Sequence, residues 1–269
     1  MSAYTNTITS IAIGSFDGLH VAHRALIDQA EGVVVIERGR GYLTPGYKRS
    51  WYTDKPLFFY RFEKIQGWSA EEFVAQLRRD FPRLRRIVVG YDFGFGQGRA
   101  GDAAHLKALF DGEVVIVDEV RIDGISVHSR VIREYLAAGD IPLANRLLGR
   151  EYALDGEVIA GQGIGGRELV PTINLRVRHY QLPAEGVYAT RTQVEGVWYP
   201  SVSFIGHRET TDGSFAVETH LIDRAIGTVR GRILIAFVGS IRPNRRFESL
   251  SELKTQIAHD IAQAKSMTI

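Results

Sequence analysis

The sequence predicts a Rossmann-like α/β domain in its first half, followed by a small antiparallel six-stranded β-barrel and a C-terminal helix. Up to about residue 150, short and wholly apolar strands alternate with helical segments, which is typical of a parallel sheet covered on both faces. Beyond that point six strand patterns follow one another with no helix between them, which favours a small barrel. The expected domains are therefore residues 1–150 and 151–269.

The elements of the first half follow from hydrophobic periodicity and helix caps. Ser69 and Glu72 form a capping box, and Asp102 and Asp140 are N-cap residues, the last followed by Pro142 in a first helical turn. The expected strands are Ser10–Gly14, Val33–Ile36, Pro56–Tyr60, Ile87–Tyr91 and Val114–Val117. The expected helices are His20–Ala30, Ser69–Phe81, Asp102–Phe110, Val127–Ala138 and Ile141–Leu148.

The second half shows strand patterns joined by short turns such as Glu195-Gly196 and Asp212-Gly213. The expected strands are Tyr152–Ala160, Thr172–Val177, Val187–Val194, Trp198–Ile205, Phe215–Ile222 and Ile233–Val238. A second capping box, Ser249 to Glu252, begins a final helix that is expected to run to about Ala264.

Composition narrows the class of protein. The 269 residues suit two domains, and 45% hydrophobic with 24% charged residues is typical of a globular protein. The net charge of +2 gives no field that would favour nucleic acid or membrane partners, and neither is expected. There is no cysteine, which excludes disulfides, thiolate catalysis and Cys-ligated zinc. The sequence shows no signal-peptide pattern and no apolar stretch of membrane-spanning length, so a cytoplasmic location is expected. The sequence does not specify an oligomeric state.

The stretch GSFDGLHVAH, residues 14–23, joins the first strand to the first helix through a glycine turn. His20 and His23 lie three residues apart and share a face of the first helical turn, where both can donate to phosphate oxygens. Taken alone, such a pair is more often one packed and one solvated histidine. A zinc site is less favoured, because no third ligand is spaced nearby.

This stretch resembles the GxFDGxHxGH motif of the bacterial bifunctional riboflavin kinase/FAD synthetase family, part of the HxGH nucleotidyltransferase superfamily. The resemblance implies that His20 and His23 contact ATP phosphates and stabilise charge on the α-phosphate, with Mg²⁺ sharing that charge. Ala22 departs from the motif, which has glycine there. The nucleotide-binding residues implied by this motif are Gly14, Phe16, Asp17 and Gly18.

Two further motifs of the first half resemble the same family. VGYDFGFGQGRAGD, residues 89–102, is similar to GxDFxFGxGxxGD and implies that Asp92, Phe93 and Gly96 line the nucleotide and flavin pocket. VHSRVIR, residues 127–133, is similar to ISSTxIR and implies that Ser129 and Arg133 lie at the nucleotide, Arg133 facing the triphosphate. Taken alone, the glycine stretch is a turn and Arg133 is as often a solvated arginine. The family's TFEPHP-like segment is missing, and residues 37–60 stand in its place.

The barrel carries two motifs. GQGIGGRELVPTIN, residues 161–174, is similar to the family's GxGRxLGFPTAN but one residue shorter; it implies that Gly166 and Arg167 bind ATP, and that Thr172 and Asn174 hold Mg²⁺ and ATP phosphates. AVETHLID, residues 216–223, is similar to VEVHLLD and implies that Glu218 is the general base for the ribityl 5′-hydroxyl. From spacing alone, a turn before a strand and an outward-facing strand glutamate are the favoured interpretations.

Five motifs in the family's order predict a bifunctional transferase that makes FMN and FAD. The barrel would phosphorylate riboflavin with ATP to give FMN, and the first domain would transfer AMP from ATP to FMN, giving FAD and pyrophosphate. The substrates and products are thus riboflavin, FMN, FAD and ATP, with Mg²⁺ as cofactor. Three alternatives stay open: an enzyme with only one active half, a flavin-binding module without turnover, and an adenylyltransferase acting on another phosphate acceptor.

Overall fold

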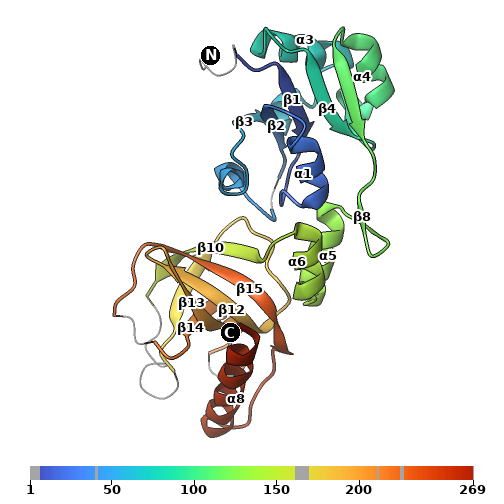
Figure 1. The fold of residues 1–269 in the computed structure, drawn as a ribbon. Helices are drawn as coiled ribbons and strands as arrows, with labels where there is room; N and C mark the ends of the chain where they lie inside the picture. The colour runs from blue at the N-terminus through green and yellow to red at the C-terminus, as the bar shows by residue number, and fades with distance from the viewer. Residues whose placement is uncertain (1–6, 40–41, 161–169, 211, 225–226, 269) are drawn as a thin grey trace. The chain divides into compact units, whose positions relative to one another are not determined.

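The computed structural model describes residues 7–39, 42–160, 170–210, 212–224 and 227–268. It divides the chain into two compact units, Met1–Ser129 and Arg130–Ile269, each described below by itself. The first unit is an α/β sheet domain and the second contains a closed barrel, so the predicted fold class is confirmed (Figure 1).

The first unit is built on a five-stranded sheet of order β3-β2-β1-β4-β7, in which every pair of neighbours is parallel. Its central strand, β1, ends directly before the predicted histidine motif. Carboxyl ends of parallel strands commonly form ligand sites in such sheets, so the motif lies at the edge where a site is expected. The strands are β1 (Ser10–Gly14), β2 (Gly32–Glu37), β3 (Leu57–Arg61), β4 (Arg86–Gly90) and β7 (Glu113–Val117).

Helices cover both faces of this sheet, as the wholly apolar strands predicted. Helices α3 (Ala70–Asp80) and α4 (Ala103–Leu109) lie on one face, packed on Ile11, Ile13 and Val34, while α1 (Val21–Ile27) packs on the other (Figure 1). The predicted capping box at Ser69 is present, and the Asp102 carboxylate accepts a hydrogen bond from the N–H of His105. Local cap chemistry therefore sets where these helices begin.

Several short elements were not predicted from the sequence. Most are single turns or two-residue strands, whose hydrophobic pattern is too short to separate from a loop. They are η1 (Gly46–Trp51), α2 (Phe62–Ile65), β5 (Gly94–Phe95), η2 (Gln97–Arg99), β6 (Gly101–Asp102), β8 (Arg121–Ile122) and β9 (Ile125–Ser126).

Helices α5 (Ser129–Ala138) and α6 (Ile141–Leu148) precede the barrel, and α6 packs against it. The Asn145 side chain of α6 donates to the carbonyl of Phe237 at 2.8 Å and accepts from the N–H of Tyr152 at 2.7 Å. Helix α5 begins two residues later than expected, because the N–H of Val127 bonds to the carbonyl of Val120. The division at residue 150 stays a prediction about the catalytic domains.

The barrel closes six antiparallel strands in the order β10-β11-β14-β13-β12-β15. All six predicted strands are present, and the last one runs five residues beyond its expected end at Val238. The strands are β10 (Tyr152–Ile159), β11 (Ile173–Val177), β12 (Gly186–Val194), β13 (Val197–His207), β14 (Phe215–Leu221) and β15 (Arg232–Pro243).

Five hydroxyl side chains form a buried network inside the barrel. Thr192 bonds to Ser201 and to Thr219 at 2.8 Å each, and Ser203 donates to Thr219 at 3.0 Å. Thr190 bonds to both Ser201 and Ser203 at 2.8 Å. Because each buried hydroxyl has partners, the polar interior carries no desolvation penalty from unmet hydrogen bonds.

Helix α8 (Leu250–Thr268) packs on the outer face of β12, β13 and β15 (Figure 1). Arg242 of β15 binds the buried Asp260 of α8 through Nη2 at 2.9 Å and through Nε, which fixes the helix on the barrel. The helix begins as predicted, with Ser249 Oγ accepting from the N–H of Glu252, but continues four residues past Ala264. Of the helices in the described ranges, none is long and apolar enough to cross a membrane.

Candidate active sites

The two motif histidines form a stacked pair at the start of α1. His20 is the N-cap residue, and its Nδ1 accepts a hydrogen bond from the N–H of His23 at 3.3 Å. The two imidazole rings are nearly parallel, with centroids 3.5 Å apart, and the ring of Phe16 meets His23 edge-on at 5.2 Å. The sequence thus predicted correctly that both histidines share one face of the first turn.

The turn between β1 and α1 has an unusual backbone. Phe16 and Leu19 have φ values of 45° and 39°, and Gly18 has φ of 90°. The buried Phe16 ring lies against Gly14, where a Cβ would come within 3.3 Å of it. Arg49, fully buried on η1, donates from Nε to the carbonyl oxygen of Phe16 at 3.2 Å. Left-handed backbone at non-glycine residues is typical of functional turns that surrounding contacts hold in place.

Asp17 has a structural task in this turn. Its buried carboxylate accepts hydrogen bonds from the N–H groups of Leu43 and Thr44, at 3.1 and 2.9 Å. Its carbonyl oxygen accepts a hydrogen bond from Ser129 Oγ at 2.8 Å. The structure therefore brings two of the predicted residues of the first unit, Asp17 and Ser129, into contact. The predicted contact of Asp17 with the nucleotide stays a prediction.

The second motif lies in the turns after β4. The Asp92 side chain is exposed, while Phe93 stacks on Phe95 with ring centroids 5.5 Å apart and packs against the core. Gly96 has φ of 73°, and a Cβ there would lie 3.1 Å from the N atom of Ala70 at the start of α3. Phe93 and Gly96 thus have packing roles beside any ligand role. Arg133 lies on α5 in the second unit, and its contact with the triphosphate stays a prediction.

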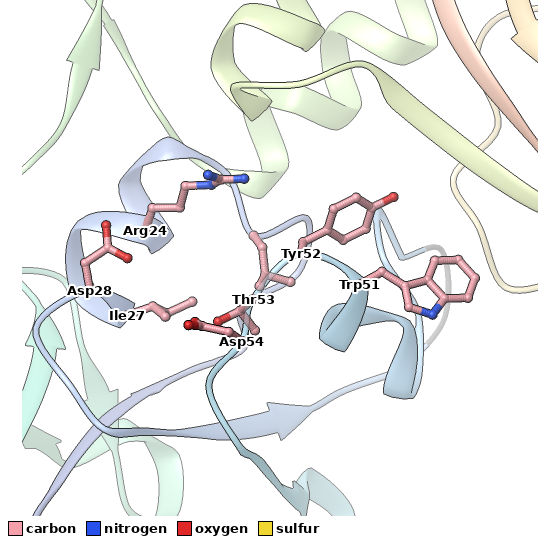
Figure 2. A pocket seen from close by; sticks show the side chains of 8 residues that line it. Arg24, Ile27, Asp28, Trp51, Tyr52, Thr53 and Asp54 are labelled. Atoms are coloured by element: carbon pink, nitrogen blue, oxygen red, sulfur yellow. The ribbon is translucent and has the colours of Figure 1, made fainter. Parts of the chain in front are cut away.

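A pocket of about 570 Å³ lies in the first unit beside the histidine turn (Figure 2). Arg24 and Ile27 of α1 and Asp28 directly after it line one side, and the segment 51–54 lines the other. Leu19 of the histidine turn lines the pocket as well. This second segment belongs to the stretch 37–60, which stands where the family's TFEPHP-like segment is missing. None of the residues predicted from the motifs lines this pocket.

The barrel brings two of its predicted residues together. Asn174 of β11 and Glu218 of β14 are direct cross-strand partners. Thr219 points into the barrel toward the hydroxyl network, so alternation places Glu218 on the outer face, as the sequence predicted. Thr172 directly precedes β11 and is half-buried. Gly166 and Arg167 lie outside the described residues.

Arg208 joins these two residues, although no motif of the sequence pointed to it. It follows β13, and its Nη2 donates to Asn174 Oδ1 at 2.8 Å and to Glu218 Oε1 at 2.5 Å. Its Nε also donates to Glu218 Oε1 at 3.1 Å. A signal existed: an arginine at the far end of a hairpin whose second strand carries Glu218 can reach back along that strand.

The end of the same hairpin is held by Glu185. Its Oε2 accepts from the N–H of His207 at 2.9 Å, and its Oε1 lies 2.9 Å from His207 Nδ1. These bonds, chiefly the one from the His207 backbone, lower the pKa of Glu185 below its ordinary value. His207 directly precedes Arg208, so this contact fixes the backbone from which Arg208 extends.

The donor chemistry near Asn174 suits a hard cation. The Thr172 hydroxyl and the Asn174 amide oxygen are oxygen donors of the kind that Mg²⁺ prefers. Within the described ranges, no three His, Cys, Asp or Glu side chains cluster to hold a metal by themselves. Magnesium sites that rest on one or two protein oxygens take their remaining ligands from substrate phosphates and water. Asn174 Oδ1 accepts one hydrogen bond from Arg208 Nη2 and keeps a second lone pair, so Thr172 and Asn174 fit Mg²⁺ brought together with ATP.

Comparisons with known proteins agree with this two-part arrangement. The family model for FAD synthetase matches residues 54–131, and the model for riboflavin kinase matches residues 148–268. A crystal structure named as a macrolide-efflux protein from Streptococcus pneumoniae has the same fold, with a TM-score of 0.85 at 24% identity, covering 96% of this chain and 93% of its own.

Two curated relatives carry the same name, bifunctional riboflavin kinase/FMN adenylyltransferase. The protein from Pseudomonas fluorescens is 32% identical over 95% of this chain and 91% of its own length. The protein from Escherichia coli K12 is 31% identical over the same shares. With this identity spread along nearly the whole of both chains, the chain belongs to the bifunctional riboflavin kinase/FMN adenylyltransferase family.

Proposed function

We propose that this chain catalyses two successive transfers from ATP: phosphorylation of riboflavin to FMN in the barrel, and adenylylation of FMN to FAD in the α/β domain. The observation that carries the proposal is that each fold unit holds its own polar site. One is the stacked pair His20 and His23 after the central strand, and the other is Glu218 beside Asn174 on the barrel. Membership of the family supports the same assignment.

In the kinase step, Glu218 accepts the proton of the ribityl 5′-hydroxyl while that oxygen attacks the γ-phosphorus of ATP. The bond between the γ-phosphorus and the bridging oxygen breaks, and ADP leaves. A half-buried carboxylate on the outer face of the barrel suits this role, because it can reach a bound substrate. Thr172 and Asn174 would hold Mg²⁺ with the ATP phosphates, and Gly166 and Arg167 are assigned to ATP as well. Bound Mg²⁺ supplies charge neutralisation on these phosphates.

In the adenylyl step, a phosphate oxygen of FMN attacks the α-phosphorus of ATP, and pyrophosphate leaves. This step needs no proton abstraction by the protein, so catalysis consists of positioning and charge stabilisation. His20 and His23 donate to the α-phosphate as its charge develops, and Arg133 binds the triphosphate. The nucleotide site is shaped and held by the remaining residues of the three motifs: Gly14, Phe16, Asp17, Gly18, Asp92, Phe93, Gly96 and Ser129.

We assign residues 1–150 to adenylylation and residues 151–269 to phosphorylation, with Mg²⁺ required in both. We place the reactions in the cytoplasm, in keeping with the cysteine-free composition.

Product analysis tests the proposal. The protein is mixed with ATP and Mg²⁺ and with either riboflavin or FMN, and the flavins are separated by chromatography. We expect FMN followed by FAD from riboflavin, and FAD from FMN. FMN alone or FAD only from FMN would identify an enzyme with one active half. Flavin binding without either product would identify a binding module, and AMP transfer to another phosphate acceptor but not to FMN would redirect the first domain.

A further inference from the structure

Arg208 occupies a position between the two residues that the kinase proposal depends on. It follows β13 at the turn to β14, where its own N–H bonds to the carbonyl of Ser214 at 3.0 Å. Its guanidinium uses all three nitrogens: Nη1 donates to Ser214 Oγ at 2.6 Å, Nε and Nη2 donate to Glu218 Oε1, and Nη2 also reaches Asn174 Oδ1. Ser214 thus anchors the guanidinium from the turn, and the opposite side of the fork faces the site.

The contact with Glu218 is made to one oxygen only. Both donor nitrogens end on Oε1, and no hydrogen bond from the described residues reaches Oε2. The side chains of Arg208 and Glu218 are each about one-fifth exposed, at 19%, so their charges are partly shielded from solvent. A carboxylate held by one oxygen has its plane fixed while the other oxygen stays available to take a proton.

We propose that Arg208 is a positioning residue for riboflavin phosphorylation: it fixes Glu218 by Oε1, leaves Oε2 as the base oxygen, and ties this carboxylate to Asn174. The inference rests on the proposed role of Glu218 as general base. A planar guanidinium is needed because a single ammonium cannot reach Ser214, Asn174 and Glu218 together in this geometry.

The test uses the full-length protein with Arg208→Ala, Arg208→Lys and Arg208→Gln. We expect kcat for FMN formation to fall about 10- to 100-fold in R208A, the size of effect that misplacing a catalytic group produces. The KM for riboflavin should change little, and FAD formation from FMN should keep its wild-type rate. Added guanidinium chloride should restore part of the activity of R208A, and R208K should recover less than guanidinium does.

Arg191→Ala is the matched control. Arg191 binds Glu151 on the same barrel with the same geometry, since Nε and Nη2 both reach Glu151 Oε2, at 3.1 and 2.7 Å. This variant should keep its kcat and show no response to guanidinium. Glu218→Gln tests the base itself, because a wild-type kcat in E218Q would refute Glu218 as the base.

Other outcomes refute the role of Arg208 alone. If E218Q is inactive while R208A and R208Q keep the wild-type kcat, Arg208 has no positioning role. A rise in KM with unchanged kcat would instead make Arg208 a substrate-binding residue. A loss of kcat that guanidinium does not restore would indicate a structural role, and thermal unfolding of R208Q, which keeps an amide donor, decides this if R208A fails to fold.

Discussion

The hydroxyl of Ser129 donates a hydrogen bond to the carbonyl oxygen of Asp17 at 2.8 Å, across 112 positions of sequence. Asp17 in turn holds Leu43 and Thr44 through its carboxylate. One short path of hydrogen bonds therefore runs from the start of α5 through the histidine turn to the segment that follows β2. The conformation of the histidine turn depends on its contacts with Ser129 and with Leu43 and Thr44.

Replacing Ser129 with alanine should weaken FAD formation and leave FMN formation unchanged. The variant loses one hydrogen bond to the histidine turn, so we expect a stability loss of about 1 kcal/mol and a fall in the adenylylation rate. Urea unfolding and the two separate assays measure both effects. Ser50→Ala is the control, because the exposed Ser50 hydroxyl also donates to a backbone carbonyl, that of Tyr47, at 2.8 Å. Equal adenylylation rates in the two variants would contradict this role of Ser129.

Replacing His20 with alanine should reduce FAD formation from FMN by about 10²-fold or more, as expected when a donor to developing charge is removed. FMN formation from riboflavin should not change, because the barrel has its own site. His105→Ala is the control, since His105 is an exposed histidine of the same unit. If H20A makes FAD at the wild-type rate, the assignment of the histidine pair to the α-phosphate is wrong.

Removing divalent cations should stop both reactions, and added Mg²⁺ should restore them. Asn174→Ala should raise the Mg²⁺ concentration needed for half-maximal FMN formation about 10-fold or more, by loss of an oxygen donor. The Mg²⁺ dependence of FAD formation should stay the same in this variant. Titrations of Mg²⁺ in the two assays measure this, and an unchanged Mg²⁺ requirement for FMN formation would remove Asn174 from the metal site.

Glu185 predicts a pH dependence of stability. Contacts with His207 lower the pKa of Glu185 below its ordinary value of 4.5, so its stabilising effect is complete above pH 4.5 and is lost as the pH falls through the lowered pKa. Glu185→Gln should therefore unfold more easily than wild type at pH 7, by less than about 1 kcal/mol because the group is exposed. The difference should narrow below pH 4.5 in urea titrations; a gap that stays constant with pH would contradict this account.

The sequence predicted those features that depend on local chemistry. The caps at Ser69, Asp102 and Asp140 depend on side chains next to the helix they begin, and the alternation around Glu218 correctly separated the two faces of β14. Arg208 and the Asp17 contacts were not predicted, because both depend on residues that only the folded chain brings together. Helix α8 and strand β15 continue past the ends that their hydrophobic patterns predict, because the two elements pack on each other.

The hydroxyl network inside the barrel has a consequence for the chemistry outside it. Ser203 and Thr219 bond across β13 and β14, and Thr219 is the residue next to Glu218. A slip of β14 by one residue would break these bonds and turn Glu218 into the interior, because successive side chains point to opposite faces. An aliphatic interior would oppose that slip less, because apolar contacts are not directional and can form with several neighbouring side chains. The buried hydroxyls thus fix the register of β14, and this register places Glu218 opposite Asn174.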